Sequence, residues 1–446
     1  MKGLRLINGR NQIRRVLLSR TPIFKTKLSD AQKELLAQVF NESLPLSQFI
    51  QRIFAEVDRD GDDAVERIAS ALGDQAPRPH EISRDELLRA RSLVSADLQA
   101  ALELSAGRIQ DFHQKAMPTD WMDSSTGCGQ IFRPVERAGI YAPGGRASYP
   151  SSLLMTAIPA ITAGVSEVII ATPPGPDGNI PLETLAAAEI AGADKVISMG
   201  GAQAVAALSL GTNSVPKVDV ISGPGNIFVV MAMQFSFGMV GIPSLPGPTE
   251  TLLIGDSSAN AAEVAADLLA QAEHDPMASP ILLTPSGELA ESVMVEIDKQ
   301  IDSLPRSSIA STALTKCGGI GLVESIPEAI ELANEYAPEH LCLLTKDADK
   351  LLNNIHNAGG IFVGSRCSEV LGDYVAGPSH VMPVGGTARH SSPVSVTDFM
   401  KRSSIFAIPD DQIAHLSQTA AKIARAEGLE GHARAAEYRL PSKGNY

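Results

Sequence analysis

The sequence predicts an α/β protein in which two domains each contain a parallel sheet. After Tyr141, short runs rich in β-branched residues alternate with alanine-rich stretches that have helical spacing. Such alternation is typical of βαβ units, whose strands pair in parallel. Between residues 28 and 114 apolar residues recur at three-to-four spacing, which predicts helices. The 446 residues, 44% of them hydrophobic, are enough for two or three domains with their own cores.

Two series of strands and helices account for most of the chain after Tyr141. The first series predicts strands at 167–171, 195–198 and 218–221 and helices at 182–191, 202–210 and 226–237. The second predicts strands at 251–254, 280–283, 341–344 and 361–363 and helices at 261–273 and 328–335. Glycine and proline concentrate at 143–145 and 243–248, so we expect domain boundaries there. The tail after about residue 409 again has helical spacing.

The charge balance and the apolar segments exclude two classes of partner. With 37 basic against 51 acidic residues the formal net charge is −14, which repels nucleic acid and anionic membranes. The longest apolar stretch, 152–168, is interrupted by Pro159 and Gly164 and is shorter than the ~20 residues of a membrane-spanning helix. The four cysteines form no CxxC pair, so neither a disulfide framework nor a thiolate zinc site is indicated. We therefore expect a cytoplasmic protein with no nucleic-acid or membrane partner.

The first 29 residues differ from the rest in charge. They contain no acid and eight basic residues: Lys2, Arg5, Arg10, Arg14, Arg15, Arg20, Lys25 and Lys27. A basic, acid-free start is typical of an organelle transit peptide, and it is equally what an arm that docks on an acidic body requires. Few serines and no processing site favour the docking arm, with organelle targeting as the alternative.

Two glycine-rich turns are candidates for phosphate binding. The turns at 199–203 and 222–226 each follow a predicted strand and open a predicted helix. Free N–H groups and the positive end of a helix dipole favour a phosphate at such a place, and ligands of parallel sheets lie beyond the carboxyl ends of the strands. Neither turn has the GxGxxG pattern of a dinucleotide site, so an ordinary tight turn remains the other interpretation.

A helix and a segment that contains a proline hold candidate ligands and proton acceptors in the second series. On the helix 261–273, the apolar stripe of Val264 and Leu268 continues into Gln271 and His274, which are either two metal ligands or a hydrogen-bonded helix end. In the segment 335–341, Pro338 ends a helix and delivers Glu339 and His340 to the next strand. A carboxylate beside an imidazole supplies two proton acceptors with different pKa values, although adjacent Glu-His pairs are also common by chance.

Two further segments place acids and histidines in predicted irregular backbone. The segment 372–380 is too rich in glycine and proline for a helix, and its Asp373 either completes a metal site or forms an Asx turn. Glu427 and His432 flank 428–431 and read alone as surface residues. Four other histidines lie in polar stretches and are predicted to be solvated: His80, His113, His356 and His415.

Nine separated segments together resemble the histidinol dehydrogenase family over nearly the whole chain. They are GIYAPGGR (139–146), GGAQAVAAL (200–208), GPGNIFV (223–229), PGPTE (246–250), LAQAEHD (269–275), YAPEHL (336–341), GDYVAGPSHVMP (372–383), GGTAR (385–389) and the pair Glu427 and His432. The resemblance implies two incomplete Rossmann-like domains with parallel sheets, plus helical N- and C-terminal arms. It divides the chain into an N-terminal arm (1–29), a first α/β domain (30–140 and 249–394), a second, NAD-binding α/β domain (141–248) and a C-terminal arm (395–446).

The resemblance also implies an activity and roles for individual residues. The expected reaction is the oxidation of L-histidinol through L-histidinal to L-histidine with two NAD⁺, the last step of histidine biosynthesis. His340 would accept the alcohol proton, and Glu339 would activate the water that hydrates the aldehyde. One zinc ion per subunit would be held by Gln271, His274, Asp373 and His432. Substrate would be contacted by these four ligands and by Thr249, His340, His380 and Glu427, and NAD by Tyr141, Gln203 and Asn226.

The implied quaternary structure is a homodimer in which the C-terminal arm crosses over, so that His432 reaches the partner's site. One residue departs from the family pattern, because Thr249 stands where serine is more common. Its extra methyl group leaves open a paralogous zinc- and NAD-dependent dehydrogenase of another small polyol or a hydroxy-sulfonate. Glu427 favours histidinol, because a carboxylate suits a cationic amine. A zinc-binding scaffold without catalysis would not require both Glu339 and His340.

Overall fold

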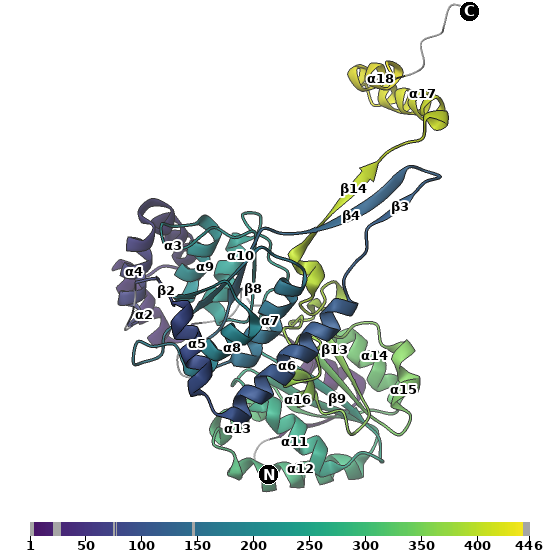
Figure 1. Ribbon diagram of the computed structural model, residues 1–446. Helices are drawn as coiled ribbons and strands as arrows, with labels where there is room; N and C mark the ends of the chain where they lie inside the picture. The colour runs from purple at the N-terminus through teal and green to yellow at the C-terminus, as the bar shows by residue number, and fades with distance from the viewer. Residues whose placement is uncertain (1–3, 21–27, 75, 77, 145–147, 440–446) are drawn as a thin grey trace, which may run out of the picture. The chain divides into compact units, whose positions relative to one another are not determined.

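The computed structural model describes residues 4–20, 28–74, 76, 78–144 and 148–439 (Figure 1). Lys2, Lys25 and Lys27 of the basic arm, and part of the glycine-rich stretch 143–145, lie outside the described residues. The chain divides into two compact units, Met1–Ala116 with Val135–Phe399, and Met117–Pro134 with Met400–Tyr446. Each is described by itself.

The larger unit contains a six-stranded sheet in which all strands run parallel. The order is β1 (Leu6–Asn8), β11 (Gly319–Leu322), β10 (Ser279–Thr284), β9 (Glu250–Gly255), β12 (His340–Leu344) and β13 (Gly360–Val363). One face packs on α11 (Ala261–Ala272), α12 (Gly287–Gln300) and α13 (Ser307–Lys316). The other face packs on α1 (Arg10–Val16), α14 (Ile326–Tyr336) and α15 (Ala348–Leu351). Burial on both faces explains why these strands are almost continuously apolar.

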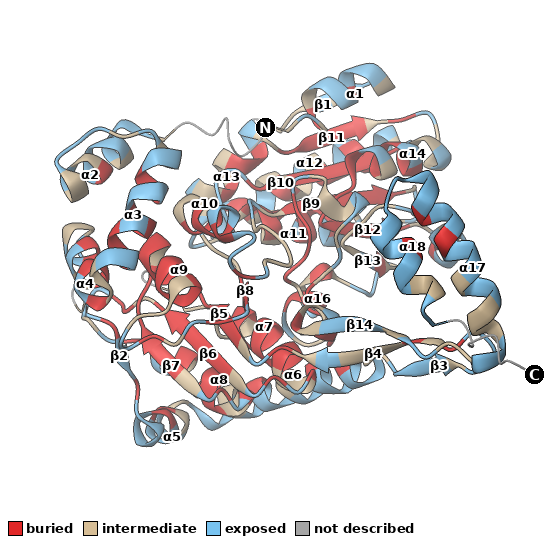
Figure 2. Ribbon diagram, turned by 90° about the horizontal axis from the view of Figure 1, so that it is seen from above, coloured by how far each residue is buried: buried red, intermediate tan, exposed pale blue. Residues whose placement is uncertain are grey.

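The same unit contains a second sheet, which has five strands. The order is β2 (His80–Glu81), β7 (Lys195–Ser198), β6 (Glu167–Thr172), β5 (Arg137–Tyr141) and β8 (Val220–Ser222), with β2 antiparallel and the others parallel. The helices that follow β5, β6, β7 and β8 are α7 (Pro150–Thr162), α8 (Leu182–Ala191), α9 (Gly201–Leu210) and α10 (Ile227–Ser236). The strand order therefore reverses direction between β5 and β8. Figure 2 shows the strands of both sheets as buried between helices with exposed outer faces.

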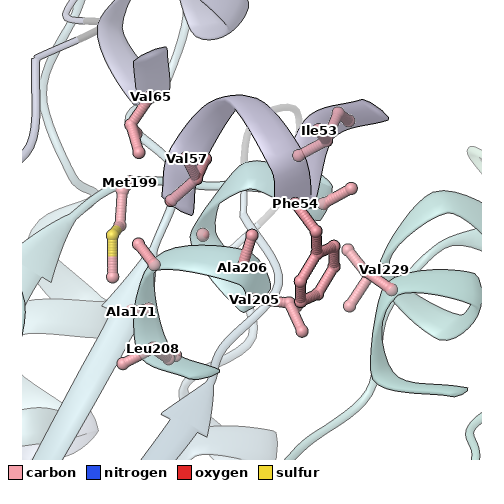
Figure 3. Close-up of a cluster of buried hydrophobic side chains, with 14 of the residues drawn as sticks. Ile53, Phe54, Val57, Val65, Ala171, Met199, Val205, Ala206, Leu208 and Val229 are labelled. Atoms are coloured by element: carbon pink, nitrogen blue, oxygen red, sulfur yellow. The ribbon is translucent and has the colours of Figure 1, made fainter. Parts of the chain in front are cut away.

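The helical N-terminal segment shares a core with the five-stranded sheet. Its helices are α2 (Asp30–Phe40), α3 (Leu46–Asp60), α4 (Asp62–Ala71), α5 (Arg84–Leu93) and α6 (Ala96–Lys115). Figure 3 shows Phe54 and Val57 of α3 and Val65 of α4 in one cluster with Val205 of α9 and Val229 of α10. Phe54 and Val57 belong to one apolar stripe along α3, and burial of this stripe holds α3 against the helices that cover the sheet.

The smaller unit joins two distant parts of the sequence. Its antiparallel sheet has the order β14 (Met400–Phe406), β4 (Cys128–Pro134) and β3 (Trp121–Asp123). Helices α17 (Asp410–Ala426) and α18 (Glu430–Glu437) follow and pack on each other through Ala421, Ala424 and Ala433.

The predicted α/β class with parallel sheets is confirmed by the pairing of β5–β8 and of β9–β13. Among the described residues, no helix is both long and apolar enough to cross a membrane.

Candidate active site

The local backbone explains how the Glu339–His340 pair reaches the six-stranded sheet. Helix α14 ends at Ala337, whose φ of 52° is left-handed, and Pro338 prevents further helix. Glu339 therefore precedes β12, and His340 is its first residue, opposite Thr251 at the start of β9. Both members of the pair are buried. The site thus lies at the amino edge of the parallel strands.

The carboxylate of Glu339 is held through one of its two oxygens. Oε2 accepts hydrogen bonds from the Thr249 hydroxyl (2.8 Å) and from the Glu250 N–H (3.0 Å). No hydrogen bond from the described residues reaches Oε1. Burial raises the pKa of Glu339 to about 7, although the charge of His340 and these hydrogen bonds oppose the shift. A carboxylate with this pKa can both accept and release a proton near neutral pH.

The imidazole of His340 lies among carboxylates. Nδ1 is 3.2 Å from the Glu250 carbonyl oxygen and 3.6 Å from Glu339 Oε2. Nε2 is 3.5 Å from Asp373 Oδ1, beyond a normal hydrogen bond. Burial alone would lower the pKa of His340, yet the nearby carboxylates raise it to about 10. The ring also stacks on Phe362, with centroids 5.9 Å apart.

Three of the four predicted metal ligands lie in the larger unit. Gln271, in the last turn of α11, is buried; its amide nitrogen is 3.3 Å from Asp373 Oδ2, and its Oε1 is 3.0 Å from the Thr249 hydroxyl. His274 follows two residues after α11 and is exposed. Although burial opposes it, the neighbouring His340 lowers the pKa of Asp373, which keeps that carboxylate charged. Within the described residues, no three His, Cys, Asp or Glu side chains gather closely enough to hold a metal.

These three donors are chemically suited to zinc, although they do not complete a site. An amide oxygen, a carboxylate oxygen and an imidazole nitrogen are all ligands that Zn²⁺ accepts. The buried Gln271 and Asp373 side chains already touch, and His274 is one helical turn from Gln271.

The structure corrects the predicted backbone around Asp373. The segment was expected to be a loop throughout, but Asp373 lies in the short helix α16 (Glu369–Tyr374), and only the following residues are irregular. Glycine is required at position 372 because its α-carbon packs against the ring of Phe362, and a side chain there would collide with that ring. A glycine chosen for close packing was thus misread as a loop signal.

His380 connects the two sheets of the larger unit. Its Nδ1 lies 2.6 Å from the carbonyl oxygen of Asp373, and its Nε2 lies 3.1 Å from the hydroxyl of Ser152, at the start of α7. Helix α7 follows β5 at the carboxyl edge of the five-stranded sheet. The amino-edge site of one sheet is therefore linked by His380 to the carboxyl edge of the other.

Glu427 and His432 belong to the smaller unit, and their backbone also differs from the expectation. Glu427 caps the C-terminus of α17, Gly428 takes a left-handed φ of 76°, and His432 lies within α18. Both side chains are exposed. The segment read as irregular is a tight connection between two helices, which glycine permits.

The predicted NAD residues lie at the carboxyl edge of the five-stranded sheet. Tyr141 is the last residue of β5, and its hydroxyl accepts the N–H of Gly201 (3.0 Å) at the start of α9. Gln203 is buried with no partner for its Oε1 among the described residues. Asn226 follows β8, caps α10 through Phe228 and Val229 N–H groups, and is exposed. Tyr141 and Asn226 thus flank the place where the strand order reverses, which is where ligands of such sheets bind.

Sequence reasoning missed one buried acid and misjudged one histidine. Glu369 is fully buried, accepts the Thr251 hydroxyl (2.5 Å), and has a pKa raised to about 7 by burial. Glu369 lies just before the segment 372–380 and belongs to none of the motifs that the sequence analysis singled out. His113 was predicted to be solvated but is fully buried, with neither ring nitrogen bonded among the described residues. Its place on the inner face of α6 shows in the spacing from buried Leu102, Ser105 and Ile109.

A buried acid–base pair beside polar donor atoms, joined to a nucleotide-type sheet edge, defines an α/β enzyme of the dehydrogenase type. The family described as histidinol dehydrogenase matches residues 39–440. The histidinol dehydrogenase of Dehalococcoides mccartyi (strain CBDB1) is 49% identical over 392 residues, covering 88% of this chain and 90% of that protein. That of Deinococcus radiodurans is 45% identical over 431 residues, covering 96% and 98%.

A solved structure agrees with these sequences. The crystal structure of histidinol dehydrogenase from Elizabethkingia anophelis superposes with a TM-score of 0.89 at 32% identity, covering 98% of both chains. The chain belongs to the histidinol dehydrogenase family.

Proposed function

We propose that this chain oxidises L-histidinol to L-histidine in two NAD-dependent steps, through L-histidinal. Its close relatives are histidinol dehydrogenases over most of their length, and the chain is an NAD-dependent oxidoreductase of their family. The observation that carries the proposal is the buried Glu339–His340 pair, which places a carboxylate with a pKa near 7 beside an imidazole.

In the first step the neutral imidazole of His340 takes the hydroxyl proton of the alcohol as hydride leaves the carbinol carbon for NAD⁺. Its Nδ1 donates to the Glu250 carbonyl, which orients the ring and leaves Nε2 as the atom that meets the substrate. The alcohol is oxidised to the aldehyde, one NAD⁺ is reduced to NADH, and the proton remains on His340. General-base assistance of this kind typically accelerates a reaction by about 10²–10⁴-fold.

In the second step Glu339 activates water. Its Oε2 is fixed by Thr249 and Glu250, so its Oε1 is available to a water molecule. The water adds to the aldehyde carbon as its proton passes to Glu339. The anion of the hydrate then gives hydride to a second NAD⁺, and the carboxylic acid that forms releases its proton to solvent to give the carboxylate. Since Glu339 has a pKa near 7, it can return the proton before the next turnover.

Zinc is part of the proposal. Gln271, His274 and Asp373 would hold one zinc ion together with His432 of a second subunit. When bound, the ion would fix the imidazole and amine of the substrate and offset the charge of Asp373 beside His340. Thr249, His380 and Glu427 would contact the substrate. NAD would lie along Tyr141, Gln203 and Asn226, in the segment 141–248.

The proposal includes a homodimer with exchanged C-terminal arms, in which His432 of a second subunit supplies the fourth ligand. It predicts complementation between two inactive variants. Chains with His432→Ala retain the base, and chains with His340→Asn retain the ligand. When the two variants are refolded together, the mixture should regain part of the activity, since each hybrid dimer contains one intact site. Hybrids that form and stay inactive would contradict a shared site.

The overall function is tested by following NADH with purified protein and L-histidinol. We expect two NADH per substrate consumed and L-histidine as product. The alternative substrate is another small polyol or a hydroxy-sulfonate. The exposed carboxylate of Glu427 disfavours the hydroxy-sulfonate, because both groups are negatively charged. Turnover of such an alcohol without turnover of L-histidinol would refute the proposal.

A further inference from the structure

The described part of the basic N-terminal arm is built into the six-stranded sheet. Strand β1 pairs with β11, and Ile13 and Leu17 are buried in the core beneath α14. Arg10 and Arg14 form ion pairs with Glu331 and Glu335 on the outer face of α14. The arm therefore runs along the helix that leads into the acid–base pair.

Arg20, at the end of this stretch, makes a different set of contacts. Its guanidinium donates to both carboxylate oxygens of Glu250, at 2.5 and 2.7 Å. It also donates to the carbonyl oxygens of Tyr336 (2.6 Å) and Ala337 (3.4 Å), and lies 3.6 Å above the Tyr336 ring. The Arg20 side chain is 22% exposed and that of Glu250 only 7%. One planar cation thus joins the end of α14 to the start of β9.

Both segments held by Arg20 touch the acid–base pair. The backbone of Glu250 contacts each member, through its N–H to Glu339 Oε2 (3.0 Å) and its carbonyl oxygen to His340 Nδ1 (3.2 Å). Ala337 is the left-handed residue that turns the chain into Pro338 and Glu339. Such a backbone conformation is unfavourable for alanine, so it persists only where its surroundings hold it.

We infer that Arg20 is a positioning residue for the acid–base pair. It acts through Glu250 and Ala337 and does not itself reach the reacting atoms. Arg20 lies before the range 39–440 that the family description matches. The helix end adds to the fit, because carbonyl groups at a helix C-terminus attract a cation. The kinetic consequence rests on the proposed function, whereas the structural consequence does not.

The kinetic test uses the full-length enzyme with L-histidinol and NAD⁺. Arg20→Gln should lower kcat at least about tenfold while both KM values stay within about threefold, because small misplacements slow proton transfer more than binding. Arg20→Lys should recover part of kcat, since it keeps the charge without the planar fork. Arg14→Gln is the matched control: it removes an arm arginine that pairs with Glu335 instead, and kcat should stay within about twofold.

A double variant separates positioning from simple anchoring of the arm. If Arg20 acts through Glu250, the losses in kcat of Arg20→Gln and Glu250→Gln should not multiply in the double variant. Unchanged kcat in Arg20→Gln, a change in KM alone, or an equal loss in Arg14→Gln would overturn the inference. Should Arg20→Gln fail to fold, Arg20→Lys decides, because it must still lose more kcat than the control.

Hydrogen–deuterium exchange tests the inference without any substrate. The amides of residues 250, 336, 337 and 339–341 should exchange faster in Arg20→Gln, or in Arg20→Lys, than in wild type, and should be unchanged in Arg14→Gln. Equal rates in all proteins would refute positioning even if activity changed. If the wild-type protein fails to oxidise L-histidinol, the proposed function falls, and the exchange rates still decide the role of Arg20.

Discussion

The two sheets of the larger unit carry the proposed cofactor residues and the acid–base pair at opposite edges. At the carboxyl edge of the five-stranded sheet, the last residues of the parallel strands carry uncharged hydroxyl groups: Tyr141, Thr172, Ser198 and Ser222. At the amino edge of the six-stranded sheet, the first residues of β9 and β12 are Glu250 and His340. The same strand–helix architecture therefore presents a neutral edge in one sheet and a charged edge in the other.

Helix polarity explains this division. In a parallel α/β layer, helices begin at the carboxyl edge of the sheet and end at its amino edge. Helix N-termini favour anions, which suits the phosphates of a nucleotide at α9 and α10 without any basic side chain. Helix C-termini favour cations. Arg20 at the end of α14 follows this rule, and the proposed zinc ligand Gln271 at the end of α11 fits it as well.

The largest effect should come from the charged edge. We expect His340→Asn to lower kcat by about 10²–10⁴-fold, because the base is lost while the shape of the side chain is nearly kept. Zinc content, measured by elemental analysis, should stay at the wild-type level. Loss of zinc from this variant would mean that His340 is a ligand, and the separation of proton transfer from metal binding would be wrong.

At the neutral edge, Tyr141→Phe should affect the cofactor and leave proton transfer unchanged. The variant loses the hydroxyl that accepts the Gly201 N–H, which exposes one unpaired donor at the start of α9. We expect KM for NAD⁺ to rise about 3–10-fold, from a hydrogen bond of about 1 kcal/mol. The internal control is KM for L-histidinol, which should stay within about twofold. A fall in kcat larger than the rise in KM would place Tyr141 in the chemistry.

Two buried imidazoles show how neighbouring groups set the pKa of a histidine in this protein. Carboxylates raise the pKa of His340 to about 10, whereas burial without a partner lowers the pKa of His113 to about 4. Below pH 6.5 the unfolded chain binds a proton at His113 that the folded chain refuses. The contribution of the neutral His113 ring to the free energy of unfolding is therefore complete above pH 6.5 and is lost as the pH falls towards 4.

The consequence for unfolding can be measured. Between pH 7 and pH 5, His113 should cost wild-type protein about 2 kcal/mol of unfolding free energy. His113→Leu should remove this part of the pH dependence, since no hydrogen bond from the described residues is lost. Urea unfolding at the two pH values gives the comparison. Parallel losses in both proteins would show that the ring takes up its proton while folded.

Each helix or strand could be predicted only as far as it leaves a local pattern in the sequence. Alternating β-branched and alanine-rich stretches predicted β6, β7 and β9 within a few residues. Strand β11 (Gly319–Leu322) was missed because two of its four residues are glycines, which read as a turn. An amphipathic helix shows that it has a buried face without showing which sheet buries it. The division implied by the resemblance places residues 30–140 with the strands after 249 and stays a prediction; in the structure α3 and α4 pack on α9.

The site shows the same limit. The proline before Glu339 predicted correctly that the pair would begin a strand. The approach of Asp373 to Gln271 joins positions 102 residues apart, and no local pattern encodes such a contact. The resemblance to a family supplied it instead. Arg20 was marked only as one of eight basic residues of a docking arm, and Glu369 left no signal, because their particular partners and burial are created by the fold.

The smallest effect should come from Thr249, which stands at the charged edge between Gln271 and Glu339. Its hydroxyl lies within hydrogen-bonding distance of Gln271 Oε1 (3.0 Å) and Glu339 Oε2 (2.8 Å), and its one proton serves one of them at a time. Thr249→Ser keeps that hydroxyl and removes only a methyl group, so kcat and KM for L-histidinol should both stay within about twofold. Thr249→Val is the matched control, because it keeps the volume and removes the hydrogen bond, which should lower kcat about 5–10-fold. A larger change in Thr249→Ser than in Thr249→Val would mean that the methyl group, and not the hydroxyl, governs the fit of the substrate.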